Sequence, residues 1–294
     1  MTEDKMEATD QPDEETLDRS ILDRPIEDTL EIDLASQVPV KRRKGIYILP
    51  NFFTLAALFS GFYAVIAAMN GDFTTASVAI FIAMILDSLD GRVARLINAQ
   101  SAFGAELDSL SDIVCFGVAP ALMIYKLDIS YLHNIHWGKV AWLCSFIYMG
   151  CVALRLARFN IQTDEAPTAF SKRYFSGLPC PAPAGLLAAL VWLVDTYSWA
   201  STEVSIFFCV FLVILAALQI SSIPFRSFKD IDLNVRVRFA AIVIILVALV
   251  LISWQPPEVL SLIFLTYCFS GPVSWLWKNR KLGLEKLKRG RGAK

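Results

Sequence analysis

The sequence predicts an all-α, polytopic membrane protein with eight transmembrane helices. Of its 294 residues, 55% are hydrophobic and 19% are charged, whereas soluble domains are roughly 45–50% apolar and about 25% charged. Eight stretches without any charged residue follow residue 44, and about 20 apolar residues are enough to cross a bilayer as a helix. Together these observations exclude an ordinary soluble protein.

The charge-free stretches differ in length, and the short ones are the most informative. Five have the length of a membrane span or nearly so, while the second, third and fourth are short by five or more residues. Each short stretch reaches full length only by including charged residues, so we expect charged side chains within helices at the membrane boundary. The eight stretches are 45–71, 73–86, 113–125, 140–154, 174–194, 204–225, 239–257 and 259–277. The included charges are Asp87, Asp90, Arg92 and Arg95 after the second stretch, Asp108 and Asp112 before the third, and Arg155 and Arg158 after the fourth.

The two ends of the chain have compositions of their own. Residues 1–40 contain 13 Asp or Glu and 3 Lys or Arg, which is typical of a disordered extension. No apolar stretch within residues 1–44 is long enough for a signal peptide. We therefore expect an acidic disordered tail with a basic juxtamembrane end (1–44), a core (45–225), two additional transmembrane helices (226–277) and a basic tail (278–294).

Lys and Arg residues gather on one side of this predicted topology. The connections near residue 72 and at 127–139, 195–203 and 254–258, with their flanks, carry only Lys126 and Lys139. Basic connections stay in the cytoplasm. We therefore expect a multi-pass protein of the cytoplasmic membrane, with both termini and the clustered charges on the cytoplasmic side.

Four carboxylates form the pattern that indicates chemistry. Asp87 and Asp90 are three residues apart on one helix, and Asp108 and Asp112 are four apart on the next, so each pair shares a helix face. Ionisable residues within a span usually mark a functional site. The alternative is that these residues lie beyond the membrane and pair with Arg92 and Arg95, although that would leave an excess of negative charge. Oxygen ligands alone select a hard ion, Mg²⁺ first and Mn²⁺ second.

The same residues carry a resemblance to a known family. Eight positions fit the signature D-x2-D-G-x2-A-R-x8-G-x3-D-x3-D, and every fixed position matches: Asp87, Asp90, Gly91, Ala94, Arg95, Gly104, Asp108 and Asp112. This pattern resembles the signature of the CDP-alcohol phosphotransferase family. The resemblance implies a six-helix catalytic core over residues 45–225.

The resemblance also implies roles for individual residues. The metal ligands would be Asp87, Asp90, Asp108 and Asp112, with Asp112 also the catalytic general base. The CDP-diacylglycerol contacts would be Asn51, Thr54, Gly91, Arg95 and Ser101, where Asn51 and Thr54 belong to a P-N-x-x-T element. Two simpler interpretations stay open, because Pro and Asn commonly begin helices and Ser101 is equally consistent with an ordinary loop serine.

Two further elements are similar to the phosphatidylserine synthase branch of that family, whose acceptor is L-serine. They are the R-L-A-R-F-N sequence of residues 155–160 and the G-L-P-C-P-A-P-A sequence of residues 177–184, with Cys180 and Pro183 departing from the usual pattern. By this resemblance, Arg155, Arg158 and Asn160 bind serine, and Lys172 and Arg173 could assist. Alternatively, both arginines are positive-inside anchors.

The resemblance thus implies a metal-dependent transferase of phospholipid biosynthesis. It would transfer a phosphatidyl group from CDP-diacylglycerol to L-serine, giving phosphatidylserine and CMP, and would work as a homodimer in the lipid bilayer without a nucleic-acid partner. An alternative is the same family with glycerol 3-phosphate, inositol phosphate or choline as acceptor. A more remote alternative is a cation transporter, although such a site is expected near mid-membrane.

Overall fold

The computed structural model of this chain describes residues 48–97, 101–131, 135–163, 174–226 and 239–291. These residues form helices α3 (Ile48–Met69), α4 (Phe73–Leu96), α5 (Ala102–Asp112), the π-helical turn η1 (Ile113–Val118), α6 (Ala119–Tyr131), α7 (Ile135–Thr163), α9 (Pro181–Thr196), α10 (Thr202–Ile220), α11 (Phe239–Trp254) and α12 (Pro256–Arg291), with the short strands β1 (Tyr174–Ser176) and β2 (Pro224–Arg226). All of them belong to the unit Gly45–Lys294.

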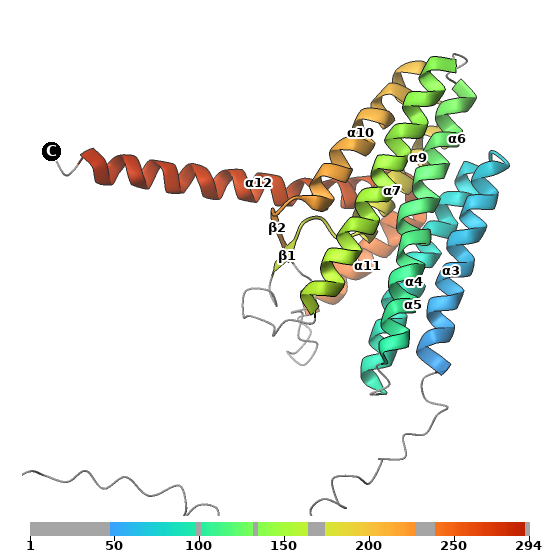
Figure 1. Cartoon of the computed structure of the whole chain (residues 1–294), viewed down its shortest axis with the longest axis horizontal. Helices are drawn as coiled ribbons and strands as arrows, with labels where there is room; N and C mark the ends of the chain where they lie inside the picture. Colours follow the sequence, from blue (N-terminus) through green and yellow to red (C-terminus); the bar gives the residue numbers. More distant parts are fainter. Residues whose placement is uncertain (1–47, 98–100, 132–134, 164–173, 227–238, 292–294) are drawn as a thin grey trace, which may run out of the picture. The chain divides into compact units, whose positions relative to one another are not determined.

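The expected all-α membrane fold is confirmed (Figure 1). Within the described part of the chain, six helical segments are long and apolar enough to span a membrane: Ile48–Met69, Phe73–Leu96, Ala102–Asp128, Gly138–Ile161, Thr202–Ile220 and Pro256–Trp277. The other two expected spans coincide with α9 and α11, each of 16 residues. At about 1.5 Å per residue, each of these covers roughly 24 Å of a hydrocarbon core about 30 Å thick. Their crossing of the membrane stays a prediction.

The three short charge-free stretches become full-length helices in the way expected. α4 continues through Asp87 and Asp90 to Leu96. α5, η1 and α6 form one continuous helical segment that includes Asp108 and Asp112. The membrane-boundary charges are therefore held on helices and not on flexible connections.

The stretch at 174–194 is not helical throughout, in contrast to the prediction. Its first residues form β1, which pairs antiparallel with β2 in the register Tyr174↔Arg226, Phe175↔Phe225 and Ser176↔Pro224. Gly177 then adopts a φ of 84°, a conformation that favours glycine. Helix α9 begins only at Pro181 because proline suits the first helical turn and not the interior of a helix.

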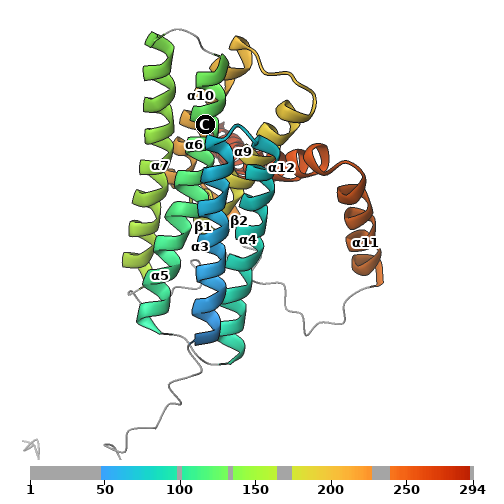
Figure 2. The same ribbon diagram turned by 90° about the vertical axis from the view of Figure 1, so that its right-hand side faces the viewer.

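Helix α9 lies at the centre of the bundle. Residues 182–189 are buried on every side, as expected for a helix that is apolar all round. It packs against α4 on one side and against α12 on another, while α7 packs against α10. α3 and α4 run side by side as an antiparallel pair, as Figures 1 and 2 show.

A tight turn joins α3 to α4 at the end far from the carboxylates. Gly71 has a φ of 82°, and Asp72 caps α4 by accepting a hydrogen bond of 3.0 Å from the backbone N–H of Thr75. Hydrogen bonds from Thr75 keep the pKa of Asp72 below its usual value. Because the turn is short, α3 and α4 are constrained to lie alongside each other.

Close helix contacts depend on small residues. The buried face of α3 contains Ala57, Gly61, Ala64 and Ala68. A Cβ atom at Gly61 would lie 2.6 Å from Cys115 Sγ and 3.0 Å from Cys115 Cα on η1. Lipid tails are as apolar as leucine, so helices in a membrane associate largely through such close packing.

We predict that Gly61→Ala destabilises the protein by roughly 1–3 kcal/mol, because the added methyl group would overlap Cys115 Sγ and crowd the Cys115 backbone on η1. Gly150→Ala on α7 is the matched control. A Cβ there meets no atom of the described residues within 4 Å, and alanine favours a helix by about 1 kcal/mol. Thermal unfolding of the purified protein in detergent compares the two variants, and equal melting temperatures would contradict the close α3–η1 contact.

Candidate metal and substrate site

Four carboxylates converge where α4 approaches α5. Ligand oxygens of Asp87, Asp90 and Asp108 all lie within 4.8 Å of one another. Asp112 follows one turn after Asp108, and its carboxyl group is within hydrogen-bonding reach of Asp87. The structure thus brings together the four carboxylates of the signature, three of them in one cluster and Asp112 next to it.

The donor chemistry of this group fits a hard divalent cation. The three clustered side chains offer only carboxylate oxygens, the ligands preferred by Mg²⁺ and Mn²⁺. Asp108 Oδ1 and Asp112 Oδ1 are buried and accept no hydrogen bond from the described residues. Buried carboxylate oxygens without donors are costly unless a cation compensates them, so the site has the composition and the unmet charge of a metal centre.

Thr54 lies beneath the cluster and contacts it directly. Its hydroxyl donates a hydrogen bond of 2.7 Å to Asp90 Oδ2, and only 3% of Thr54 and 5% of Asp90 is exposed. Ser111 on α5 donates in turn to the Thr54 carbonyl oxygen at 3.4 Å. The structure places the Thr54 hydroxyl on a carboxylate of the cluster, and its expected contact with substrate stays a prediction.

Asn51 and Ser101 both lie against Gly104 in the first turn of α5. A Cβ atom at Gly104 would lie 3.1 Å from both Asn51 Oδ1 and Ser101 Oγ, so the glycine permits their close approach. Ser101 Oγ accepts a hydrogen bond of 3.0 Å from the Gly104 backbone N–H and caps α5. The structure therefore gives Ser101 a structural role, and its expected contact with substrate stays a prediction.

Gly91 and Arg95 lie on the exposed end of α4. A Cβ atom at Gly91 would meet nothing within 4 Å among the described residues, so open space adjoins the residue after Asp90. The Nε atom of Arg95 donates to the Gly91 carbonyl oxygen at 3.0 Å. This arrangement leaves the backbone of α4 accessible next to the carboxylates.

Arg155 connects the cluster to α7 and α9. Its Nη1 atom donates to Cys180 Sγ at 3.1 Å, and it interacts electrostatically with Asp112. Its Nε atom is buried without a hydrogen-bond partner in the described part of the chain. Arg155 is thus a half-buried cation whose charge acts on the fourth carboxylate.

The other residues expected to bind serine make hydrogen bonds to α10 and α5. Arg158 is exposed, and its Nη1 atom donates to the Ile220 carbonyl oxygen at the end of α10, at 3.4 Å. Asn160 Nδ2 donates to Ser109 Oγ on α5 at 3.1 Å. Lys172 and Arg173 lie outside the described residues. Binding of serine by Arg155, Arg158 and Asn160 stays a prediction.

Helix α10 contributes a polar residue that sequence analysis missed. Gln219 is 1% exposed, and neither its Oε1 nor its Nε2 has a hydrogen-bond partner among the residues described. Its backbone carbonyl lies against Gly177, just before α9. The only signal in the sequence was that Gln219 is the one amide in the stretch 204–225.

A π-helical turn directly follows Asp112. The backbone N–H of Ala119 donates to the carbonyl of Val114, five residues earlier. Neighbouring helices hold the turn, since Tyr148 Oη donates to the Phe116 carbonyl at 3.1 Å and Cys115 Sγ to the Ala57 carbonyl at 3.2 Å. Such turns are frequent at functional sites, and this one sets the orientation of α5 relative to α6.

Comparison with known proteins agrees with this geometry. The sequence model described as CDP-alcohol phosphatidyltransferase matches residues 47–218. A Helicobacter pylori protein named CDP-diacylglycerol--serine O-phosphatidyltransferase is 34% identical over 243 residues, covering 83% of this chain and 97% of the relative. A Mycobacterium leprae protein of the same name is 33% identical, covering 80% of this chain and 76% of its own length. An archaetidylserine synthase of Methanothermobacter thermautotrophicus is 32% identical over 63% of this chain and 72% of its own. With the carboxylate cluster in place and the family match spanning the core, the chain belongs to the CDP-alcohol phosphatidyltransferase family.

Proposed function

We propose that this protein transfers a phosphatidyl group from CDP-diacylglycerol to L-serine and releases CMP. The observation that carries the proposal is the aspartate cluster of α4 and α5 in a chain that aligns along nearly the whole of a relative named for this reaction. The reaction breaks the bond between the diacylglycerol phosphate and CMP and forms a bond from that phosphorus to the serine oxygen.

Asp87, Asp90, Asp108 and Asp112 would hold Mg²⁺ or Mn²⁺. A bound divalent cation would neutralise negative charge on the pyrophosphate and on the departing CMP, which is the main requirement of phosphoryl transfer. The chain itself supplies the positions of these carboxylates. Thr54 orients Asp90 through its hydrogen bond, as residues behind a metal ligand commonly do.

Asp112 is suited to accept the proton of the serine hydroxyl. It lies next to the cluster, has an oxygen without a donor among the described residues, and is influenced by the positive charge of Arg155. A guanidinium in this position can bind the serine carboxylate in a bidentate manner. The serine hydroxyl would then point towards Asp112 while its carboxylate is held on α7.

The nucleotide would bind at the open end of α4. Gly91 leaves room beside the backbone, and Arg95 offers a guanidinium for phosphate oxygens. Asn51, next to Gly104, would contact the nucleotide from α3, and Ser101 has a hydroxyl hydrogen available for phosphate. The lipid part of the donor would stay in the bilayer.

The distribution of basic residues supports a cytoplasmic active site. Carboxylates at the ends of α4 and α5 share the side of the membrane on which Lys and Arg gather. We propose that both termini and the site face the cytoplasm, and that the enzyme acts as a homodimer, as the family resemblance implies. This location at helix ends argues against a cation transporter, whose site is expected near mid-membrane.

We predict that the purified enzyme releases CMP from CDP-diacylglycerol with L-serine, and that excess chelator abolishes this activity. The assay compares L-serine with glycerol 3-phosphate, inositol phosphate and choline. Release with one of these alcohols but not with L-serine would contradict the acceptor and leave the family assignment intact. Full activity in excess chelator would reject the metal requirement.

Variants of the carboxylate cluster and of Thr54 should weaken metal binding. Asp87→Asn or Asp108→Asn removes a ligand charge and should raise the Mg²⁺ concentration for half-maximal activity. Thr54→Val loses the hydrogen bond to Asp90 and should raise it by roughly 10- to 100-fold. Thr54→Ser keeps the hydroxyl and is the matched control. A Thr54→Val enzyme with unchanged Mg²⁺ dependence would show that this hydrogen bond does not position the metal ligand.

The two arginines of α7 should differ in their effect on serine. Losing a charge-assisted hydrogen bond costs about 1.5–3 kcal/mol, or roughly tenfold to more than a hundredfold in binding. Arg155→Lys should therefore raise the KM for serine by that factor with less effect on CDP-diacylglycerol. The exposed Arg158 provides a comparison, since Arg158→Lys should raise the KM for serine less than Arg155→Lys does. If both variants weaken CDP-diacylglycerol alone, these arginines belong to the phosphate site.

A further inference from the structure

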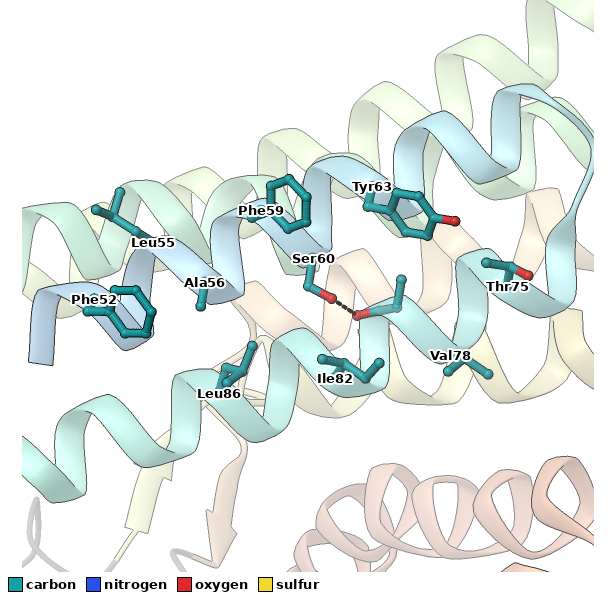
Figure 3. A pocket seen from close by; sticks show the side chains of 11 residues that line it. Phe52, Leu55, Ala56, Phe59, Ser60, Tyr63, Thr75, Val78, Ile82 and Leu86 are labelled. Carbon is teal, nitrogen blue, oxygen red and sulfur yellow. Dashed lines mark hydrogen bonds between the residues drawn. The ribbon is translucent and has the colours of Figure 1, made fainter. Parts of the chain in front are cut away.

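An apolar groove lies on the outside of α3 and α4 (Figure 3). Its Ser60 hydroxyl donates to the Ala79 carbonyl oxygen at 2.8 Å, the bond drawn as a dashed line in Figure 3. None of the buried polar atoms that lack a partner in the described part of the chain belongs to a residue of this groove. The groove therefore has no unmet hydrogen-bonding group that would identify a ligand.

Several buried polar atoms without partners belong instead to the proposed site and its surroundings. Among the described residues they include Asp108 Oδ1, Asp112 Oδ1, Arg155 Nε and both polar atoms of the Gln219 side chain. The proposed metal ion and the serine carboxylate would satisfy the first three. Gln219 has no such ligand, although it is 1% exposed and a buried amide without hydrogen bonds is costly.

The last turn of α10 lies beside the part of α7 that carries the two arginines. These helices pack against each other and run parallel, as two contacts show. The thiols of Cys144 and Cys209 are within hydrogen-bonding reach, and further along both helices Arg158 donates to the Ile220 carbonyl oxygen. Gln219 directly precedes Ile220, so it lies at about the level of the arginines.

The side chain of Gln219 points into the helix bundle. It shares a face of α10 with Leu212, Leu215 and Ala216, which are all at most 1% exposed. Ala217, on another face of the same turn, is exposed. The Gln219 amide is therefore directed between helices and not towards lipid.

The loop before α9 contacts both Gln219 and Arg155. A Cβ atom at Gly177 would overlap the Gln219 carbonyl oxygen, so the glycine lets this loop pack directly on the end of α10. Three residues later, Cys180 Sγ accepts the hydrogen bond of 3.1 Å from Arg155 Nη1. The charge of Arg155 in turn acts on Asp112. A short run of contacts thus connects the unpaired amide to the proposed acceptor site.

We propose that Gln219 binds the α-amino group of the serine acceptor through its Oε1 atom. This inference rests on the proposed function, because it takes Arg155 as the ligand of the serine carboxylate. An amide oxygen accepts hydrogen bonds from an ammonium group, and the Nε2 atom donates to a carboxylate. A zwitterionic amino acid would therefore satisfy both polar atoms of this side chain, which have no partner in the part of the chain that the structure describes.

This assignment makes the site selective for the handedness of the acceptor. The carboxylate would lie on Arg155, the ammonium group on Gln219 and the hydroxyl at Asp112, and only one enantiomer of serine presents these three groups in the required order. A site built to bind a polar group also rejects analogues that lack it, because its own polar atoms then stay buried and unpaired. A buried water molecule is the alternative occupant, and it would not distinguish between acceptors.

The test compares acceptor selectivity in the wild-type enzyme and in Gln219→Met, which keeps the side-chain length and removes both polar atoms. The acceptors are L-serine, D-serine and 3-hydroxypropanoate, which lacks the amino group, each with CDP-diacylglycerol and Mg²⁺. We expect Gln219→Met to lower kcat/KM for L-serine by roughly 10- to 100-fold. Its activity with 3-hydroxypropanoate and its KM for CDP-diacylglycerol should not change, so the preference for L-serine over both analogues should fall. An equal loss with all acceptors would overturn the proposal.

Leu215→Met is the matched control. Leu215 lies one turn earlier on the same buried face, and this change removes no polar group, so the variant should keep wild-type selectivity. Melting temperatures without serine distinguish a binding role from a structural one. Replacing an unpaired buried amide by an apolar side chain should not lower the melting temperature of the ligand-free enzyme. A lower melting temperature with unchanged selectivity would overturn the proposal.

The wild-type enzyme alone provides a measurement that no variant affects, since equal kcat/KM values for L-serine and D-serine would also contradict this assignment. Failure of this inference is distinguishable from failure of the proposed function. If the wild-type enzyme releases no CMP with L-serine, the proposed function is wrong. If it uses L-serine and Gln219→Met keeps the wild-type KM and enantiomer preference, only the role of Gln219 is wrong.

Discussion

The proximity of like charges at the end of α4 constrains much of the surrounding structure. Ligand oxygens of Asp87, Asp90 and Asp108 lie within 4.8 Å of one another, and negative charges at such distances repel strongly where water is scarce. The fold holds them there by hydrogen bonds and packing: Thr54 binds Asp90, and Ser111 ties α5 to α3. The charge that remains would suit a divalent cation, so the same constraint explains the local architecture and supports the proposed chemistry.

Close helix packing is the second condition for this arrangement. α3, α4 and η1 approach one another because their contact faces carry alanine, glycine and serine. Helices in a membrane need such faces, because large apolar side chains are no more stable against each other than against lipid tails. The same small residues that let α3 and α4 pack leave the apolar groove on their outer side. Helix packing and the shape of the groove therefore depend on one set of side chains.

Sequence analysis predicted the elements but not their finer contacts. The helices that contain Asp87, Asp108 and Arg155 could be predicted because a charge-free stretch too short for a span must include its flanking charges. The pairing of β1 with β2 could not, because it joins short segments about 50 residues apart in the chain and carries no local pattern. The partner of the Thr54 hydroxyl and the burial of the Gln219 amide could not be predicted either. Both depend on how several helices pack and not on the spacing of residues along one helix.

The π-helical turn after Asp112 separates two demands on a single long helical segment. In a regular α-helix each residue advances the orientation by about 100°, so the direction of Asp108 and Asp112 would dictate which face of α6 is buried. The hydrogen bond from the Ala119 N–H to the Val114 carbonyl, five residues earlier, changes the rotation of α6 relative to α5 within one turn. The lower half can then point carboxylates at α4 while the upper half turns Met123, Ile124 and Leu127 into the core. Lengthening or shortening this turn by one residue would leave both halves helical but rotate one relative to the other. The turn therefore sets the rotation that lets the carboxylates of α5 face α4 while the apolar side chains of α6 face the core.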